Sequence, residues 1–259
     1  LVPCRPCRAT GRGASSCVSE RVKMRATLPL VMRTIGWDDE RDCIVMIDQT
    51  KLPTEHTTYH AETVPELIES IEILRVRGAP ALGAAGAYGV ALSAHRRAAE
   101  DPDELIAGME EDAEAIATAR PTAVNLERGV SEALLAARDG TSTTEIREKA
   151  LEAAENLADR DVERNRTIGE NGQALLEDGD TVMTHCNAGA LATSDYGTAL
   201  SPIYTAHEQG LNPRVYADET RPLLQGGRLT AWELMRAGVD VTLICDNMAA
   251  EGMRENIID

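Results

Sequence analysis

The sequence predicts an α/β protein in which a small, mostly helical N-terminal domain with a β hairpin precedes a Rossmann-like parallel-sheet domain. Three observations predict this class. Two short β-like runs stand on either side of residue 40, and the stretch 102–176 is helical almost throughout. After 178–180 (DGD), short apolar runs alternate with helical segments. Alternation of strands and helices with short loops favours a parallel sheet.

The chain divides into three expected regions: a basic head at 1–31, a helical domain with a hairpin at 32–175, and a Rossmann-like catalytic domain at 176–259. The head lacks the apolar core of a signal peptide. It contains a C-x-x-C, Cys4 to Cys7, but no second ligand pair follows at zinc-ribbon spacing. We expect the head to be disordered. Its unusual composition is explained most simply if the true first residue is Met32 or Met24 and the assigned start lies upstream of it.

The first elements after the head form a hairpin and a helix. The runs 34–37 (TIGW) and 43–47 (CIVMI) are β-like, and the polar segment between them predicts a turn. From 64 to 76 the apolar residues recur at helical spacing, and Thr63 stands where a helix cap is expected.

A helix of small residues follows, within 75–89 (RVRGAPALGAAGAYG). Its expected N-terminus, just after Arg77 and Gly78, presents free N–H groups that favour an anion. The same composition also suits a tightly packed helix pair with Arg77 as a surface charge. The spacing alone leaves both interpretations open.

Helices are expected at 103–119, at 122–137, and as one or two segments over 142–176. Ser142, Thr143 and Glu145 approach a capping-box arrangement at the start of the last one. Most charges here belong to a solvated face. Arg120, directly before a proline at a helix start, is retained as a candidate.

The last part of the chain predicts three strands, at 181–185, 214–217 and 239–245, and three helices, at 196–209, 228–237 and from 247 to 254. A three-stranded sheet with one half-covered face is a poor complete domain. We therefore expect an incomplete sheet and a C-terminally truncated chain.

Two loops at the carboxyl ends of these strands carry the candidate chemistry, 184–193 (THCNAGALAT) and 218–230 (DETRPLLQGGRLT). Open α/β sheets bind their ligands at this edge. Cys186 follows a strand and faces a Gly/Ala turn, whose N–H groups would lower the pKa of its thiol. The alternative is a small buried apolar residue, as we expect for Cys43 and Cys245.

Composition indicates compartment and excludes some partners. The 26 basic and 43 acidic residues give a formal net charge of −17, lysine is nearly absent after the head, and phenylalanine is missing. An acidic, lysine-poor surface is typical of a halophile's cytoplasm, where salt screens self-repulsion; an ordinary acidic protein is the alternative. A nucleic-acid partner is not expected, because binding the phosphate backbone needs a basic face. No apolar run in the sequence is long enough to span a bilayer. Of the six cysteines, three lie in the head and three are widely scattered, which suggests reduced thiols and not a disulfide framework.

Four long motifs give the chain from about residue 32 onward a specific resemblance. They are 75–83 (RVRGAPALG), 119–126 (ARPTAVNL), 184–193 (THCNAGALAT), and 216–234 (YADETRPLLQGGRLTAWEL) with 246–250 (DNMAA). With them the chain resembles the methylthioribose-1-phosphate isomerases of methionine salvage, which are related to the regulatory subunits of translation initiation factor 2B.

The resemblance implies a sugar-phosphate aldose–ketose isomerase, homodimeric and acting on a small molecule. It implies Cys186 as a catalytic residue and Arg77, Gly78, Ala79, Arg120 and Gln225 as substrate-binding residues. The family's second active-site residue, an aspartate in a Gly-Ala-Asp-Arg motif, would lie beyond Asp259, so this chain could be inactive. We expect neither cofactor nor metal, because His185 and His207 lack partners at a useful spacing.

Three other interpretations remain. A ribose-1,5-bisphosphate isomerase would need an additional basic cluster for its second phosphate, and none is evident outside the head. A non-catalytic regulatory or nucleotide-sensing module related to initiation factor 2B would not be expected to keep the turn that contains Cys186. A fragment would keep the binding face and lack the catalytic acid.

Overall fold

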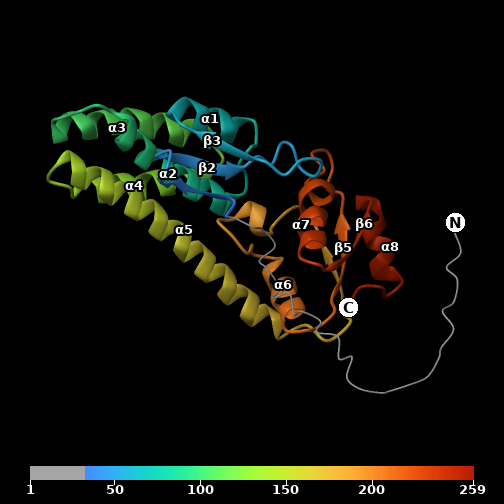
Figure 1. Cartoon of the computed structure of the whole chain (residues 1–259). Coiled ribbons are helices and arrows are strands. Elements are labelled where there is room, and N and C mark those ends of the chain that lie inside the picture. Colours follow the sequence, from blue (N-terminus) through green and yellow to red (C-terminus); the bar gives the residue numbers. More distant parts are fainter. Residues whose placement is uncertain (1–32) are drawn as a thin grey trace, which may run out of the picture.

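The computed structural model describes residues 33–259 as a group of helices and a parallel sheet, which a long helix connects (Figure 1). The predictions for 1–31, namely disorder, a C-x-x-C without a metal and a misassigned start, lie outside the described residues, as does Met32.

A small antiparallel sheet opens the described chain. It consists of β1 (Ile35–Asp38), β2 (Cys43–Ile47) and β3 (Thr58–Ala61) in the order β1-β2-β3. The predicted hairpin is confirmed, since Ile35 pairs with Met46 and Asp38 with Cys43. Strand β3 was not predicted, because Ala61 is its only buried residue and it lacks the apolar run that marks the other strands.

Five helices follow: α1 (Val64–Glu72), α2 (Ala79–Arg96), α3 (Pro102–Thr118), α4 (Val124–Arg138) and α5 (Thr143–Gln173). Thr63 caps α1 in a full capping box. The helix predicted for 64–76 ends earlier because Leu74 has left-handed backbone, at φ 65°. The segment predicted as one or two helices is the single helix α5.

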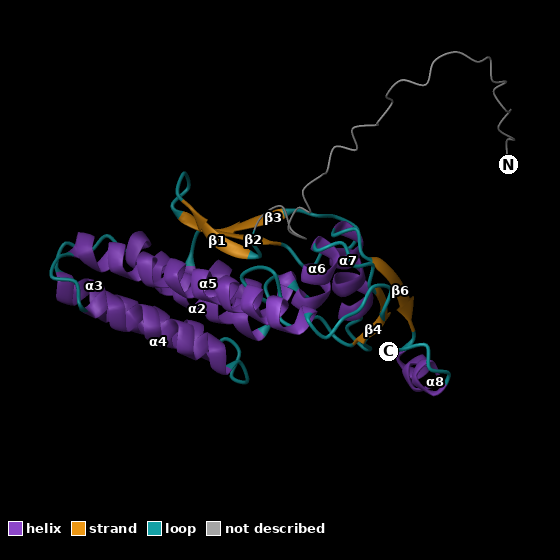
Figure 2. Cartoon of the chain, turned by 90° about the horizontal axis from the view of Figure 1, so that it is seen from below, coloured by secondary structure: helices purple, strands orange, loops and turns teal. Residues whose placement is uncertain are grey.

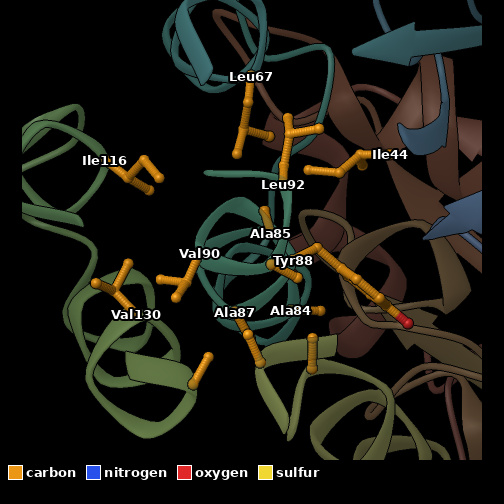
Figure 3. Close-up of a cluster of buried hydrophobic side chains, with 14 of the residues drawn as sticks. Ile44, Leu67, Ala84, Ala85, Ala87, Tyr88, Val90, Leu92, Ile116 and Val130 are labelled. Atoms are coloured by element: carbon orange, nitrogen blue, oxygen red, sulfur yellow. The ribbon is translucent and has the colours of Figure 1, made fainter. Parts of the chain in front are cut away.

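Helix α2 is the centre of the helical part. Its residues from Ala81 to Ala94 are all buried, on every side of the helix. In Figure 3, Leu92 points toward Leu67 and Ile44, while Val90 points toward Ile116 and Val130. The small residues let α4 and α5 come close, so the packing interpretation of this stretch is confirmed.

The parallel sheet consists of β4 (Thr181–Thr184), β5 (Arg214–Asp218) and β6 (Asp240–Ile244) in the order β4-β5-β6. Helices α6 (Ser201–Glu208) and α7 (Ala231–Arg236) connect the strands, and α8 (Ala249–Arg254) follows β6 (Figure 2). All three predicted strands are confirmed. Because they are parallel, their carboxyl ends meet at one edge.

Two predicted helices of this part differ from the structure. The helix expected from residue 196 begins at Ser201, and the chain before it is a buried irregular segment. The helix expected from 228 is preceded by a π-helical turn, Gly226–Thr230, that runs into α7. Within 33–259, no helix combines the length and the apolar character that crossing a membrane would require.

Candidate functional site

A cavity of about 340 Å³ opens between the start of α2, the α3–α4 loop and the carboxyl edge of the parallel sheet. The structure brings all six predicted site residues into its lining: Arg77, Gly78, Ala79, Arg120, Cys186 and Gln225. They come from segments up to 148 residues apart. The local sequence could indicate each of these residues, but it could not show that they lie close together.

The N-terminus of α2 forms one wall of this cavity. Gly78 caps the helix with φ 100°, a conformation that a residue with a Cβ rarely adopts. A Cβ there would also overlap the backbone of Ala192, so glycine lets the helix start lie against the 190–192 turn. The first backbone N–H groups of an 18-residue helix therefore border the cavity, where they favour an anion.

Arg77 is half-buried and held in place. Its Nη1 donates to Asn187 Oδ1, and its Nη2 donates to the backbone oxygen of Asn187 at 3.1 Å. Burial lowers the pKa of Arg77 from its ordinary value, while nearby Cys186 and Glu233 favour the charged form. The interpretation of Arg77 as a mere surface charge is therefore wrong.

Cys186 follows β4 in a strained conformation, with φ 68°. Two threonines hold it there: its N–H donates to Thr220 Oγ1 at 2.9 Å, and its carbonyl accepts from Thr230 Oγ1 at 2.6 Å. The Sγ accepts a hydrogen bond from Gln225 Nε2 at 3.3 Å. The segment that follows β5, the only neighbour of β4 in the described sheet, therefore holds Cys186 at the cavity.

One detail of the predicted thiol environment is wrong. We expected the amides of the Gly/Ala turn to face Cys186, but those of Ala190 and Leu191 favour the ionised carboxylate of Glu233 instead. The group that bonds to the thiol is Gln225. The difference arises because Glu233, on α7, lies directly behind the turn. Glu233 stands in the 216–234 motif, but no local pattern indicates this contact.

The turn itself is anchored by the helical part. Thr34 Oγ1 donates to Ala190 O at 2.7 Å, and Gln49 Nε2 donates to Leu191 O at 2.8 Å. From α5, buried Asp161 accepts the N–H of Ser194 at 2.8 Å. These contacts fix the segment 190–194, in which Ala190–Ala192 forms a single 3₁₀ turn, against the first part of the described chain.

Three polar side chains that line the cavity were not predicted as site residues: Gln49, Thr122 and Arg228. Arg228 lies within the 216–234 motif, which could have indicated it. Its Nε donates to Leu223 O at 3.1 Å, and its Nη1 reaches Gln49 O and Leu52 O at 3.3 and 3.2 Å. The Nε and Nη1 groups of Arg228 therefore link the loop after β5 to the loop after β2.

Three residues at the same edge of the sheet could hold a metal ion. Ligand atoms of His185, Asp218 and Asp246 lie within 4.8 Å of one another. His185 Nδ1 is 3.0 Å from Asp218 Oδ2, so the expectation that His185 lacks a partner is wrong. Both oxygens of Asp246 already accept backbone N–H groups, from Thr220 and Arg221 at 2.7 and 2.9 Å. Those bonds give the carboxylate a structural role of its own.

The cavity thus combines two kinds of group. Arg77, Arg120 and the start of α2 suit a phosphate, for which guanidinium offers paired donors. Cys186 and Gln225 offer a thiol and a neutral hydrogen-bonding amide. Such a set fits a small phosphorylated molecule with hydroxyl groups.

Comparison with known proteins identifies relatives of this chain. The profile of the Initiation factor 2 subunit family matches residues 75–259. The methylthioribose-1-phosphate isomerase of Symbiobacterium thermophilum is 47% identical over 90% of this chain and 65% of its own length.

Two solved structures are also similar. The crystal structure of 5-methylthioribose 1-phosphate isomerase from Pyrococcus horikoshii OT3 superposes with a TM-score of 0.83, at 38% identity over 88% of this chain and 64% of that one. A structure from A. fulgidus described as translation initiation factor eIF-2B, subunit delta, has a TM-score of 0.82 and 54% identity, covering 88% of this chain and 66% of that one. This chain therefore spans 64–66% of the length of these relatives.

Proposed function

The chain belongs to the initiation factor 2 subunit family, and from that premise we propose that it carries a methylthioribose-1-phosphate isomerase site. The reaction converts S-methyl-5-thio-α-D-ribose 1-phosphate into S-methyl-5-thio-D-ribulose 1-phosphate, an aldose–ketose step of methionine salvage. The observation that supports it most is that Cys186 shares one cavity with Arg77, Arg120 and the N-terminus of α2.

In this proposal the phosphate is bound by the cationic wall. Arg77 and Arg120 donate to its oxygens, and the backbone N–H groups at Gly78 and Ala79 complete the pocket. Gln225 bonds a sugar hydroxyl while it also orients the Cys186 thiol. Holding the phosphate prevents its loss while the sugar ring is open.

The chemistry needs two positioned groups. The sugar is locked as a ring because C1 carries the phosphate, so ring opening needs a proton on the ring oxygen. A proton or a hydride must then move from C2 to C1, leaving the ketone at C2. Cys186 serves as the base or stabilises the transition state. By the resemblance the second group is an aspartate in a Gly-Ala-Asp-Arg motif, which residues 1–259 do not contain.

Turnover followed by ³¹P NMR in molar KCl tests the substrate. Methylthioribose 1-phosphate should be converted, and ribose 1,5-bisphosphate should not, because the third arginine of the cavity is engaged with backbone carbonyls. The assay uses the chain as it is and a version continued after Asp259 with the C-terminal third of the Symbiobacterium relative. Absence of conversion in both would contradict the proposal and favour a non-catalytic regulatory or sensing module.

The setting of the enzyme is part of the proposal. The three cysteines in the described part of the chain are free thiols, which suits a reducing cytoplasm. The charge of −17 supports adaptation to molar salt, as in a halophile. We also propose a homodimer, which light scattering in molar KCl would test; a monomer there would contradict it.

A further inference from the structure

We infer that Glu233 is a positioning residue that holds the Asn187 amide and, through it, fixes the Arg77 guanidinium beside Cys186. The inference rests on the proposed function, in which Arg77 binds the substrate phosphate. Glu233 lies on α7, is fully buried, and is not among the residues that line the cavity.

The first step is the contact between Glu233 and Asn187. Asn187 Nδ2 donates to Glu233 Oε1 and, at 3.1 Å, to Thr230 Oγ1. Thr230 gives its own proton to the carbonyl of Cys186, so toward Asn187 its oxygen acts as an acceptor. Two acceptors on one side therefore require the NH₂ group of Asn187 to face them.

The oxygen side of the Asn187 amide faces Arg77. With Nδ2 turned toward Glu233, Oδ1 faces Arg77 and accepts from its Nη1. The backbone oxygen of Asn187 accepts from Nη2 at 3.1 Å. Two bonds from the fork of one guanidinium fix both its place and its plane. A flipped Asn187 amide would present N–H groups to a cation instead.

The surroundings of Glu233 explain why this link is specific. Tyr204 on α6, Asn187 and the amides of Leu191 and Ala190 favour its carboxylate, but burial disfavours the charge more strongly and raises the pKa to about 7. Glu233→Leu leaves the buried Nδ2 of Asn187 without this acceptor, at a cost of about 1–3 kcal/mol. Urea unfolding of the variant therefore accompanies the test, so that the effect on Arg77 is measured on folded protein.

The test compares three variants by the alkylation of Cys186, measured on its peptide by mass spectrometry. The ratio of the rates with iodoacetate and iodoacetamide reports the positive charge beside the thiol, because only iodoacetate is an anion. Glu233→Leu should lower this ratio by roughly threefold or more. Glu233→Gln, which keeps an acceptor, should not, and neither should Asp195→Asn. Asp195 is the matched control, a buried acid that bonds to the N–H of Tyr196.

Kinetics with methylthioribose 1-phosphate add a second readout. Glu233→Leu should raise KM about tenfold and leave kcat nearly unchanged, because the phosphate contact is the same in the ground and transition states. A loss confined to kcat would overturn the positioning role.

The alkylation ratio does not depend on isomerase activity. An unchanged ratio in Glu233→Leu overturns the inference even if the chain is an isomerase, whereas a lowered ratio supports it even if no variant turns over. Should Glu233→Leu fail to fold, Asn187→Ala breaks the same link and must lower the ratio. An unchanged ratio there overturns the inference as well.

Discussion

At the scale of single residues, the backbone of Cys186 gives the first prediction. Elsewhere Ala is more stable than Gly by about 0.5–1 kcal/mol, but the left-handed conformation costs a residue with a Cβ roughly 1–2 kcal/mol. With φ at 68°, Cys186→Gly should therefore be at least as stable as Cys186→Ala. Urea unfolding of the two variants measures this, and the usual order, with Ala clearly more stable, would mean that the residue is not strained.

The raised pKa of Glu233 predicts that the stability of the protein depends on pH. Its pKa is about 7 in the folded protein against an ordinary 4.5, so the folded state binds the proton more tightly than the unfolded state. This contribution is fully present below pH 4.5 and is lost as the pH rises toward 7. The loss amounts to about 3 kcal/mol.

Glu233→Gln keeps the shape and removes the titration. Urea unfolding at fixed salt between pH 4.5 and 7.5 should show the wild type losing stability relative to this variant. If the two curves of unfolding free energy against pH were parallel, Glu233 would titrate normally. Taking the difference between the two proteins cancels the contribution of the many surface carboxylates to the pH dependence.

The sequence indicated residues that share one cavity, but not the residues that support them; their roles in binding and catalysis stay predictions. Arg77, Arg120, Cys186 and Gln225 stand in long motifs and proved to share a cavity. Glu233 and Gln49 act through partners more than 40 residues away, and no local pattern indicates such contacts.

At the scale of elements, the same distinction holds. The hairpin, the parallel strands and the capped helices were predictable, because period and caps are local signals. The start of the helix predicted for 196–209 was not, because Tyr196 and Gly197 have positive φ angles. The N–H of Thr198 donates to the carbonyl of Ala188 at 2.9 Å instead of to a helical partner. A contact with a segment ten residues away thus replaced the first part of the predicted helix.

The crossing of α2 and α4 yields a prediction about packing. A Cβ on Gly129 would overlap the carbonyl oxygen of Gly83. Gly129→Ala should therefore destabilise the protein by about 2–3 kcal/mol, as overpacking does, although alanine favours helices. Gly252→Ala on α8 is the control, since nothing lies closer than 3.5 Å to its Cβ position. Thermal unfolding should separate the two, and equal midpoints would mean that α4 moves freely.

At the scale of the whole molecule, charge gives a prediction about salt. With a net charge of −17, the acidic side chains repel one another across the folded protein. Salt weakens this repulsion, because the screening length falls from about 10 Å at 0.1 M to about 3 Å at 1 M. The thermal midpoint should therefore rise by several degrees between 0.1 and 2 M KCl. A midpoint that stays constant or falls would support an ordinary acidic protein instead. The prediction that the sheet belongs to a longer one stays a prediction.

Protection of Cys186 by methylthioribose 1-phosphate would show directly whether the thiol lies in the substrate site. The chain is treated with iodoacetamide with and without saturating methylthioribose 1-phosphate, and each cysteine is followed by mass spectrometry. Cys245 is exposed, so the expectation that it is a small buried residue is wrong, whereas Cys43 is buried as expected. Because Cys245 lies after β6 and outside the cavity lining, it is a control within the same molecule. Substrate should slow the alkylation of Cys186 about tenfold or more and leave that of Cys245 unchanged. Equal alkylation of Cys186 with and without substrate would contradict this prediction.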